Sequence, residues 1–442
     1  MDLVITDATV VTSLDPPAVR SGDVVIRDGR VAEIGGDPPT GAERLERPGC
    51  VVVPGNVCAH HHLYSTLARG MPYRLEPPGT FVQILQRVWW RLDRALDEDS
   101  VRLSAWSGGA DALLAGTTTI VDHHASPATI EGSLDLIAEA LGQLGVRSVL
   151  CYEVTDRDGP ERATAGIEES RRFLKGGFPL AFGMVGAHAS FTLSEETLER
   201  CVELARDADA GIHIHVAEDA ADERDAMVRF DRRVGERLAE AGALGPRSLL
   251  AHCVHVDGPE AELIRDSGAW VAHNPRSNMN NRVGRAPVGD LGVKVALGTD
   301  GIDGDMFAES RTAFWRAREA DPAIGPPWIL ERMAASARFA GAVFEEPLLG
   351  TLAPGAPADL MVLEYDPPTP LTARNLAGHW AFGLSARHVR DVVVDGDVVV
   401  RDRRLVRSSE PEVRPRCREA AEALWRRMDD LEAHPFEPQR GA

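Results

Sequence analysis

The histidines of this 442-residue chain gather where apolar, strand-like runs come to an end. The run 51–53 is all valine, and the segment that follows it carries His60, His61 and His62. Because successive side chains of an extended chain point to opposite faces, His60 and His62 share one face and His61 takes the other. Two neutral imidazoles two positions apart can bind one metal ion. The sequence therefore predicts the first half of a metal site here.

Later strand-like runs end in further residues that bind metals or carry protons. The segment 211–216 alternates at period 2, and 247–252 and 293–299 are apolar runs. The residues at or just beyond their ends are His215, with Glu218 three positions later, His252 and Asp300. Only 14 histidines occur in the chain, so their placement at these ends favours a common site over isolated core histidines.

The middle of the chain alternates between strand-like and helix-like segments. Candidate strands lie near 51–60, 117–123, 146–154, 181–188, 211–216, 247–252, 268–273 and 293–299. Helix-like stretches such as 194–206 separate most of them. Eight β/α units that close on themselves predict an α/β fold, the (β/α)₈ TIM-type barrel, whose chemistry lies at the carboxyl ends of the strands. All the candidate ligands lie at such ends.

The two ends of the chain have a different sequence pattern, with short strand-like segments and few helix-like ones. Residues 2–53 consist of short alternating strands with an Asp-Gly turn at Asp28, and β-branched strands return at 359–363 and 392–400. We therefore expect a small composite β-sandwich of residues 1–53 and 350–408 around a barrel of residues 54–349. Residues 409–442 are expected to form a helical tail that packs on the protein or takes part in oligomer contacts.

Charge and composition narrow the classes of partner. The net charge of −20 argues against nucleic acids and anionic membranes as partners, because both require a basic surface. No apolar stretch approaches the roughly 20 residues of a spanning helix, and the first residues lack the basic start of a signal peptide, so we expect a cytoplasmic protein. The six cysteines form no C-x-x-C pair, which argues against both disulfides and a thiolate zinc site. The oligomeric state stays open, a homo-oligomer included.

The clustered residue types point to hydrolysis at a metal ion. A divalent ion held by imidazoles and one carboxylate keeps room for a water and lowers its pKa towards about 7. Glu218 could take a proton from that water and pass it to a substrate nitrogen. Attack by metal-bound hydroxide with protonation of an adjacent ring nitrogen suits nitrogen-rich heteroaromatics and releases ammonia.

Further polar residues fall at the same rim and are candidates for binding substrate. They are His188 at the end of the fourth candidate strand, His123 and His124 after the second, and Arg276 and Asn278 after the seventh. Side chains of this kind predict a pocket that hydrogen-bonds a ring with oxo and amino substituents, such as an oxo-aminopurine or a pterin.

These motifs resemble the amidohydrolase superfamily, and within it the cytosine/guanine deaminase and chlorohydrolase-like branch. The matching segments are Pro54-Gly55 leading to His60-x-His62, His215-x-x-Glu218, Ala251-His252-Cys253 and Leu297-Gly298-Thr299-Asp300-Gly301. The segments 60–65, 122–127 and 151–159 are similar to those of the aminohydrolases called SsnA. With the terminal strands, the resemblance covers nearly the whole chain.

The resemblance implies roles for the clustered residues. His60, His62, His215 and Asp300 would bind the metal, His252 would orient the attacking water or act as an outer ligand, and Glu218 would shuttle protons. Relatives with two metals use a carboxylated lysine on the fourth strand, but the lysines here are Lys175 and Lys294, so one ion is expected, zinc or else iron. This chain departs from the family by His61 between the two ligands and by Arg276 in the segment 274–278.

Two other functions compete with deamination. A hydrolase that expels chloride, an alkylamine or a ring amide nitrogen would use a similar set of residues. A metal-free scaffold on the same barrel would not need them, so the retained ligand set and Glu218 argue against it.

Overall fold

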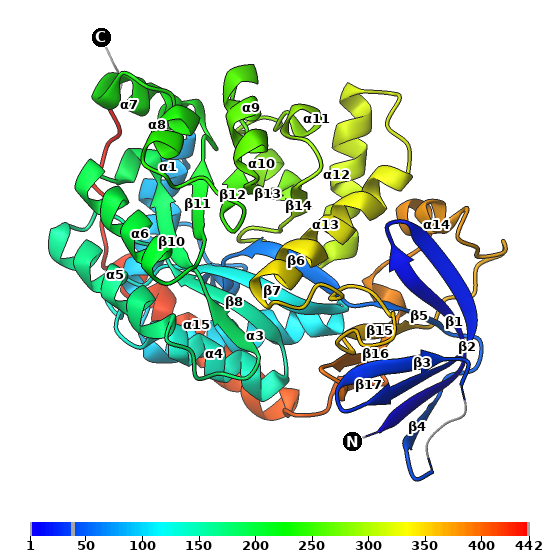
Figure 1. Cartoon of the computed structure of the whole chain (residues 1–442). Coiled ribbons are helices and arrows are strands. Elements are labelled where there is room, and N and C mark those ends of the chain that lie inside the picture. Colours follow the sequence, from blue (N-terminus) through cyan, green and yellow to red (C-terminus); the bar gives the residue numbers. More distant parts are fainter. Residues whose placement is uncertain (1, 37–39, 440–442) are drawn as a thin grey trace.

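The computed structural model describes residues 2–36 and 40–439 and shows two parts side by side (Figure 1). Helices surround the strands of the larger part. In the smaller part, strands from the start of the chain lie beside strands from its last hundred residues. The amidohydrolase-type architecture of a barrel with a β domain built from both chain ends is thus present.

Within the described residues, eight parallel strand positions form the barrel. They are β6 (Asn56–His61), β7 (Thr117–His124), β8 (Arg147–Tyr152), β9 with β10 (Ala181–Gly183 and Val185–Ala189), β11 (Ile212–Val216), β12 (Leu249–His252), β13 (Trp270–His273) and β14 (Val295–Leu297). Continuous hydrogen bonding links β6 to β9 and β10 to β14. Parallel bridges between Val154 and Ala187 and between His61 and Asp300 close the two seams.

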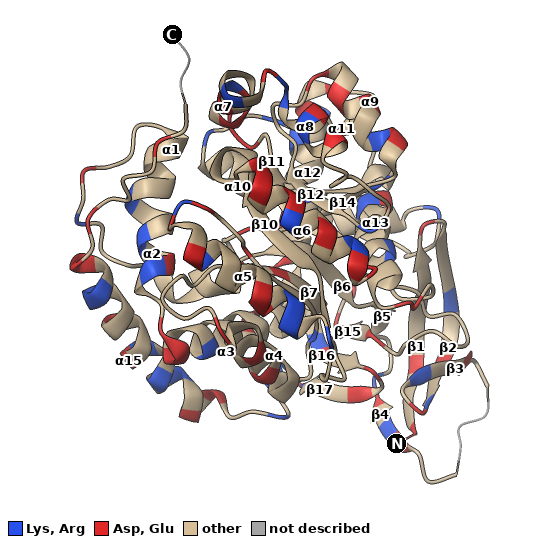
Figure 2. Ribbon diagram, turned by 60° about the vertical axis from the view of Figure 1, so that its left-hand side comes forward, with Lys and Arg blue, Asp and Glu red and all other residues tan. Residues whose placement is uncertain are grey.

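Helices cover the outside of the barrel. The longer ones are α3 (Glu98–Leu114), α4 (Ser133–Leu144), α5 (Pro160–Phe173), α6 (Glu195–Asp207), α7 (Ala220–Phe230), α8 (Val234–Glu240), α9 (Gly258–Ser267), α12 (Met306–Ala320) and α13 (Pro327–Val343). Shorter helices are η1 (Leu63–Ala68), α1 (Phe81–Ile84), η2 (Leu85–Trp89), α2 (Trp90–Ala95), η3 (Ser190–Thr192), α10 (Pro275–Asn280), α11 (Val288–Leu291), α14 (Leu376–Phe382) and η4 (Ala386–His388). On the face shown in Figure 2, acidic and basic residues are interspersed along the outer helices. None of the described helices has the length and apolarity needed to cross a membrane.

The smaller part is a nine-stranded sheet in the described chain. Its strands are β1 (Leu3–Leu14), β2 (Pro17–Arg27), β3 (Arg30–Ile34), β4 (Glu43–Glu46), β5 (Val51–Pro54), β15 (Leu360–Leu363), β16 (Val389–Val394), β17 (Asp397–Arg401) and β18 (Arg404–Leu405). The predicted first barrel strand, 51–60, is split: β5 pairs with β1 and β15, and the barrel begins with β6. The predicted domain limits themselves stay a prediction.

Side-chain alternation lets the central strands of this sheet serve two cores. Val52 and Val362 belong to the core of the β domain, whereas Val51, Val53 and Leu363 join the large core shared with the barrel. Since neighbouring residues of a strand face opposite sides, one valine-rich segment fills both layers. The apolar runs at 51–53 and 360–363 therefore attach the two parts to each other.

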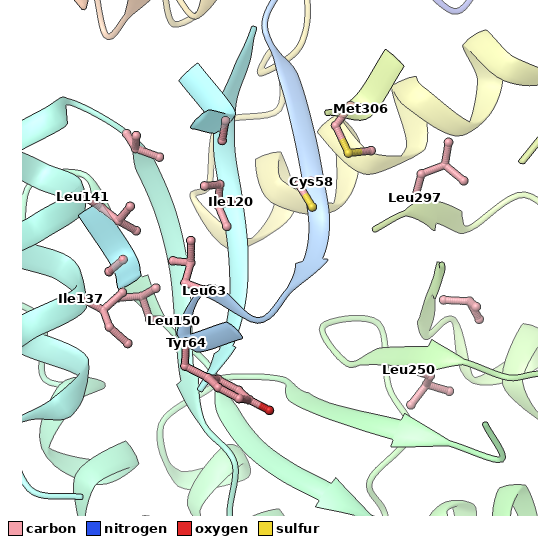
Figure 3. Close-up of a cluster of buried hydrophobic side chains, with 14 of the residues drawn as sticks. Cys58, Leu63, Tyr64, Ile120, Ile137, Leu141, Leu150, Leu250, Leu297 and Met306 are labelled. Carbon is pink, nitrogen blue, oxygen red and sulfur yellow. The ribbon is translucent and has the colours of Figure 1, made fainter. Parts of the chain in front are cut away.

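The large core continues between the barrel strands and the helices. Leu63, Ile120 and Leu150 lie with Ile137 and Leu141 of α4, as Figure 3 shows. The ring of Tyr64, next to Leu63, points away from α4. The side chain of Leu63 therefore packs in the core between strands and helices, whereas the side chain of Tyr64 is directed towards the barrel interior.

The predicted tail forms a helix followed by an extended segment. Helix α15 (Glu410–Asp429) lies along α2 and α3, and Cys417 and Leu424 are buried in that contact. The segment that follows crosses the barrel rim, where Phe436 packs on Trp90. Packing, one of the two roles expected for the tail, is therefore seen in the structure.

A buried ion pair joins the barrel to the β domain. Arg147, at the start of β8, donates from Nε to Asp359 Oδ2 over 2.8 Å and from Nη2 to Asp395 Oδ1 over 3.2 Å. Arg147 and Asp359 have side chains only 7% and 2% exposed. Removing one member of such a pair leaves the other charge buried without compensation.

We expect Asp359→Ala to lower the free energy of unfolding by about 3–5 kcal/mol, because Arg147 stays buried. Urea denaturation followed by circular dichroism measures the change. The control is Asp15→Ala. Asp15 pairs with the exposed Arg338, and loss of this exposed ion pair should lower the free energy of unfolding by less than about 1 kcal/mol. Equal small effects of both substitutions would contradict a structural role for the buried pair.

Candidate metal centre and active site

Four of the predicted ligands converge at the carboxyl ends of β6, β11 and β14. Ligand atoms of His60, His62, His215 and Asp300 all lie within 4.8 Å of one another. The Nε2 atoms of His62 and His215 are 3.2 Å apart, and Asp300 Oδ1 lies 3.1 Å from His62 Nε2 and 3.6 Å from His60 Nε2. The structure thus brings these four predicted ligands together in one group.

The hydrogen bonds of the imidazoles indicate what lies between them. His62 donates from Nδ1 to the carbonyl of His123, and His215 donates from Nδ1 to the carbonyl of His188. In the neutral rings the two Nε2 atoms therefore carry bare lone pairs that face each other. Such an arrangement is stable only with positive charge between the rings. A divalent cation satisfies this requirement, and three imidazoles with one carboxylate suit zinc-type ions.

His60, the third imidazole of the group, also has a buried Nε2 atom without a hydrogen-bond partner in the described chain. The ring is fully buried, and this Nε2 atom faces Asp300. Its Nδ1 lies 2.8 Å from His213 Nε2, so a second buried imidazole orients the ring. Burial holds the pKa of His60 well below its usual value, which keeps its lone pair free for a metal. For His62, burial also opposes protonation, but hydrogen bonding and the charge of Asp300 outweigh it and raise the pKa to about 9, so that without an ion a proton supplies the positive charge between the rings.

The backbone at the strand ends is turned to aim these side chains. Ala217, His252 and Asp300 adopt positive φ angles of 45°, 74° and 54°, a region that residues other than glycine rarely occupy. Conformations of this kind cost free energy and often occur at functional sites. The turn at Ala217 lies between His215 and Glu218.

Glu218 lies beside the ligand group, together with His252. Oε2 of Glu218 is 3.6 Å from His252 Nε2, and Oε1 accepts a hydrogen bond of 3.3 Å from Asn281. Burial raises the pKa of Glu218 to about 7, so its carboxyl group can both take and give a proton near neutral pH. Glu218 is thus placed for the proton transfer that its position after His215 predicts.

His252 is oriented by a residue that was expected to bind substrate. Its Nδ1 donates to Asn278 Oδ1 over 2.8 Å, which leaves Nε2 bare. That atom is buried, has no hydrogen-bond partner in the described chain, and lies 4.0 Å from Asp300 Oδ2. A lone pair at this position can accept a hydrogen bond from a water bound beside Asp300.

A cavity of about 670 Å³, counted with its mouth, opens above the ligand group. Its floor contains His62, His215 and Asp300, with Glu218 and Asn281 at one side. The walls are mainly aromatic and aliphatic, formed by Tyr64, Phe81, Leu85, Trp89, Trp90 and Phe191. A flat, apolar slot with a few polar groups at its base is the usual form of a site for a small ring compound.

Among the residues predicted to bind substrate, the structure brings only His188 to this cavity. His123 is fully buried, donates from Nε2 to the carbonyl of His213 and lies with Nδ1 3.2 Å from Glu153. His124 bonds to Ser126. Arg276 is ion-paired with Glu309 and Asp303, and Asn278 is engaged by His252, so neither lines the cavity.

The sequence analysis missed several residues of the cavity. Glu153 follows β8, and Asn281 follows α10. The aromatic walls come from η1, α1, η2, α2 and η3, segments between the strands. A search for acidic residues just after strand ends would have found Glu153. The aromatic residues carry no such signal, because packing partners far away in the sequence bring them to the rim.

Comparison with known proteins agrees with this geometry. Residues 51–399 match the family model of the amidohydrolase family. The chain belongs to the amidohydrolase family. Curated relatives at 30–34% identity include a 5′-deoxyadenosine deaminase from Methanosarcina mazei, which is 30% identical over 97% of this chain and 99% of its own length. A 5-methylthioadenosine/S-adenosylhomocysteine deaminase from Haloarcula marismortui is 34% identical over 97% of both chains.

Solved structures of other amidohydrolases share the fold. An adenosine deaminase from Xanthomonas campestris with bound zinc has a TM-score of 0.82 and 25% identity, covering 97% of this chain and 99% of its own. The atrazine chlorohydrolase from Arthrobacter aurescens in complex with zinc has a TM-score of 0.80 at 22% identity, covering 95% of this chain and all of its own, a likeness of fold alone. These comparisons do not bear on the narrower resemblance to SsnA.

Elemental analysis of the purified chain should find about one zinc or iron ion per protein, because the two four-residue groups that could hold a metal share His62 and His215. Asp300→Asn should lose most of this metal, since the carboxylate charge is removed. Asp303→Asn, three residues along and outside the ligand group, is the matched control and should retain the ion. Two tightly bound ions per chain, or full retention by Asp300→Asn, would overturn the assignment.

Proposed function

We propose that this chain is a metal-dependent hydrolytic deaminase of a purine-like heterocycle. The single observation that carries the proposal is the group formed by Glu218, His252 and Asp300, of which Glu218 and Asp300 line a cavity with aromatic walls. A carboxyl group with a pKa of about 7 beside a metal-ligand group suits the proton transfers of deamination. Relatives that match nearly the whole chain carry the names of nucleoside deaminases, which supports the same reaction class.

We assign the metal to His60, His62, His215 and Asp300, with His252 as a further candidate ligand. Zinc is the proposed ion, since solved relatives of the same fold contain it. When bound, the ion supplies a water with a lowered pKa as the nucleophile. The ligand group, with its facing lone pairs, supports this assignment independently of the relatives.

The protein's own residues carry the remaining steps. His252 accepts a hydrogen bond from the attacking water at Nε2, and Asn278 keeps that ring in the required tautomer. Glu218 takes one proton from the attacking water and passes it to the ring nitrogen next to the attacked carbon. It then takes the second proton from the new hydroxyl group on that carbon and passes it to the amino group, which leaves as ammonia while the hydroxyl becomes the oxo group. Asn281 holds the Glu218 carboxyl group in place. The aromatic walls exclude water from the remainder of the ring.

The proposed substrate is an oxo-aminopurine or a pterin. Tyr64, Trp89 and Phe191 offer flat surfaces to a planar ring, and the polar groups at the base match oxo and amino substituents. A pocket that hydrogen-bonds such groups discriminates strongly against rings that lack them, because its buried polar atoms are then left unpaired.

Glu218→Gln should retain the metal but reduce turnover roughly 10²- to 10⁴-fold, the usual contribution of a positioned acid–base group. Ammonia release and elemental analysis of the same preparation measure the two effects. Glu223→Gln, the same change on α7 outside the cavity, is the control. A fully active Glu218→Gln protein would remove Glu218 from the mechanism.

An ammonia-release screen over aminated purines, pterins, pyrimidines and triazines tests the function itself. We expect an oxo-aminopurine or aminopterin to exceed a chlorotriazine by a large factor in kcat/KM, since chlorotriazines leave the polar floor unmatched. Chloride release from a chlorotriazine at equal or higher kcat/KM would instead favour a chlorohydrolase.

A further inference from the structure

A second polar group in the cavity wall has no part in the proposed proton transfers. Glu153 lines the cavity just beyond β8, and the proposed mechanism leaves it without a role. Its Oε1 accepts from Arg157 over 3.1 Å, and Oε2 lies 3.2 Å from His123 Nδ1. One of its carboxylate oxygens lies within 4.8 Å of ligand atoms of His62 and His215. A charged acceptor therefore lines the cavity beside the proposed metal ligands His62 and His215.

The surroundings hold this carboxylate rigidly and keep it ionised. Arg157, 1% exposed, also pairs with Asp93 and Asp158, and the Trp90 ring lies 5.3 Å from its guanidinium carbon. Arg157 Nη1 donates to Glu153 Oε1 over 3.1 Å, so the carboxylate is paired with a buried cation. The acceptor is thus fixed before any ligand arrives, which lowers the entropy cost of binding.

His188, beside Glu153, also presents an acceptor to the cavity. The Thr192 hydroxyl donates to the carbonyl of Ala189, so its oxygen accepts from His188 Nδ1 over 2.6 Å. The neutral ring therefore has a bare Nε2. This atom lies 3.7 Å from Glu153 Oε1, too far for a hydrogen bond, and bonds to no other residue that the structure describes. Two acceptors stand side by side without a donor between them.

We propose that Glu153 and His188 form an acceptor pair that selects substrates with two adjacent hydrogen-bond donors. The inference rests on the proposed function, because it concerns the same cavity. Two chemical sources offer such donors: the 2′,3′-diol of a ribose, and the N–H edge of a free ring. A ligand without the donors leaves buried acceptor atoms of Glu153 and His188 without a hydrogen bond, which should weaken its binding roughly 10- to 100-fold.

The test uses the zinc-loaded full-length protein and two pairs of probes. Adenosine against 2′,3′-dideoxyadenosine removes the diol, and guanine against 1-methylguanine removes the ring N–H that lies beside the 2-amino group. For each pair, ammonia release gives the ratio of the two kcat/KM values. Trp89 and Trp90 line the cavity, so quenching of their fluorescence by the bound probe gives the ratio of the two Kd values. Preference for the donor-bearing member of either pair is expected, and the pair that shows it identifies the source.

Variants separate recognition from structural support. Glu153→Gln replaces one acceptor by a donor and should reduce the preferred ratio to near one. His188→Phe removes the other acceptor and should do the same, which keeps the test valid if Glu153→Gln fails to fold. Asp93→Asn disturbs the Arg157 network but leaves both acceptors, so it should preserve the ratio.

The outcomes also distinguish this inference from the proposed function. No preference within either pair, an unchanged ratio in both acceptor variants, or an equal loss in Asp93→Asn would overturn the acceptor pair. Absence of ammonia from every probe would count against the deaminase proposal. The Kd ratios would still decide whether Glu153 and His188 select for donors.

Discussion

Closure of the barrel between its last and first strands is the constraint on which the site depends. The amides of Thr299 and Asp300 both donate to the carbonyl of His60, over 2.9 and 3.0 Å. Gly298 permits this approach, because a Cβ at that position would lie 2.7 Å from the amide nitrogen of His60. The residues that close the barrel are thus also proposed metal ligands, so an intact fold and a formed site require each other.

The convergence of buried lone pairs follows from this closure. Parallel strands end at one rim, and each end delivers an imidazole or a carboxylate whose other polar atoms are already satisfied by the backbone or by a neighbouring side chain. His62 and His215 cannot turn away without losing hydrogen bonds to the carbonyls of His123 and His188. The Nε2 lone pairs of His62 and His215 therefore stay directed at one point of the rim. Binding of a cation there contributes to the stability of the folded protein as well as to its chemistry.

The sequence predicts the parts of this site that are carried by strands. Apolar runs that end in His60, His215 or Asp300 place those residues at the rim, because all strands of a (β/α)₈ barrel point the same way. The directions of side chains in the loops after the strands cannot be predicted in this way. Arg276 follows β13 as expected, yet Glu309 on α12, 33 residues later, pairs with it away from the cavity. Asn278 lies one helical turn inside α10, where it reaches His252 instead of a ligand.

The cavity walls depend on contacts that no local pattern records. Trp90 and Phe191 come from separate segments, and Phe436, near the end of the described chain, packs on both. Gln86 ties this last segment down by accepting at its carbonyl from the His434 amide and donating to the carbonyl of Phe436. Since Phe436 packs on both Trp90 and Phe191, which line the cavity, the shape of the cavity is set jointly by residues about 250 to 350 positions apart. Motifs at the strand ends therefore predict the polar groups of the site, whereas these distant contacts determine the shape of its walls.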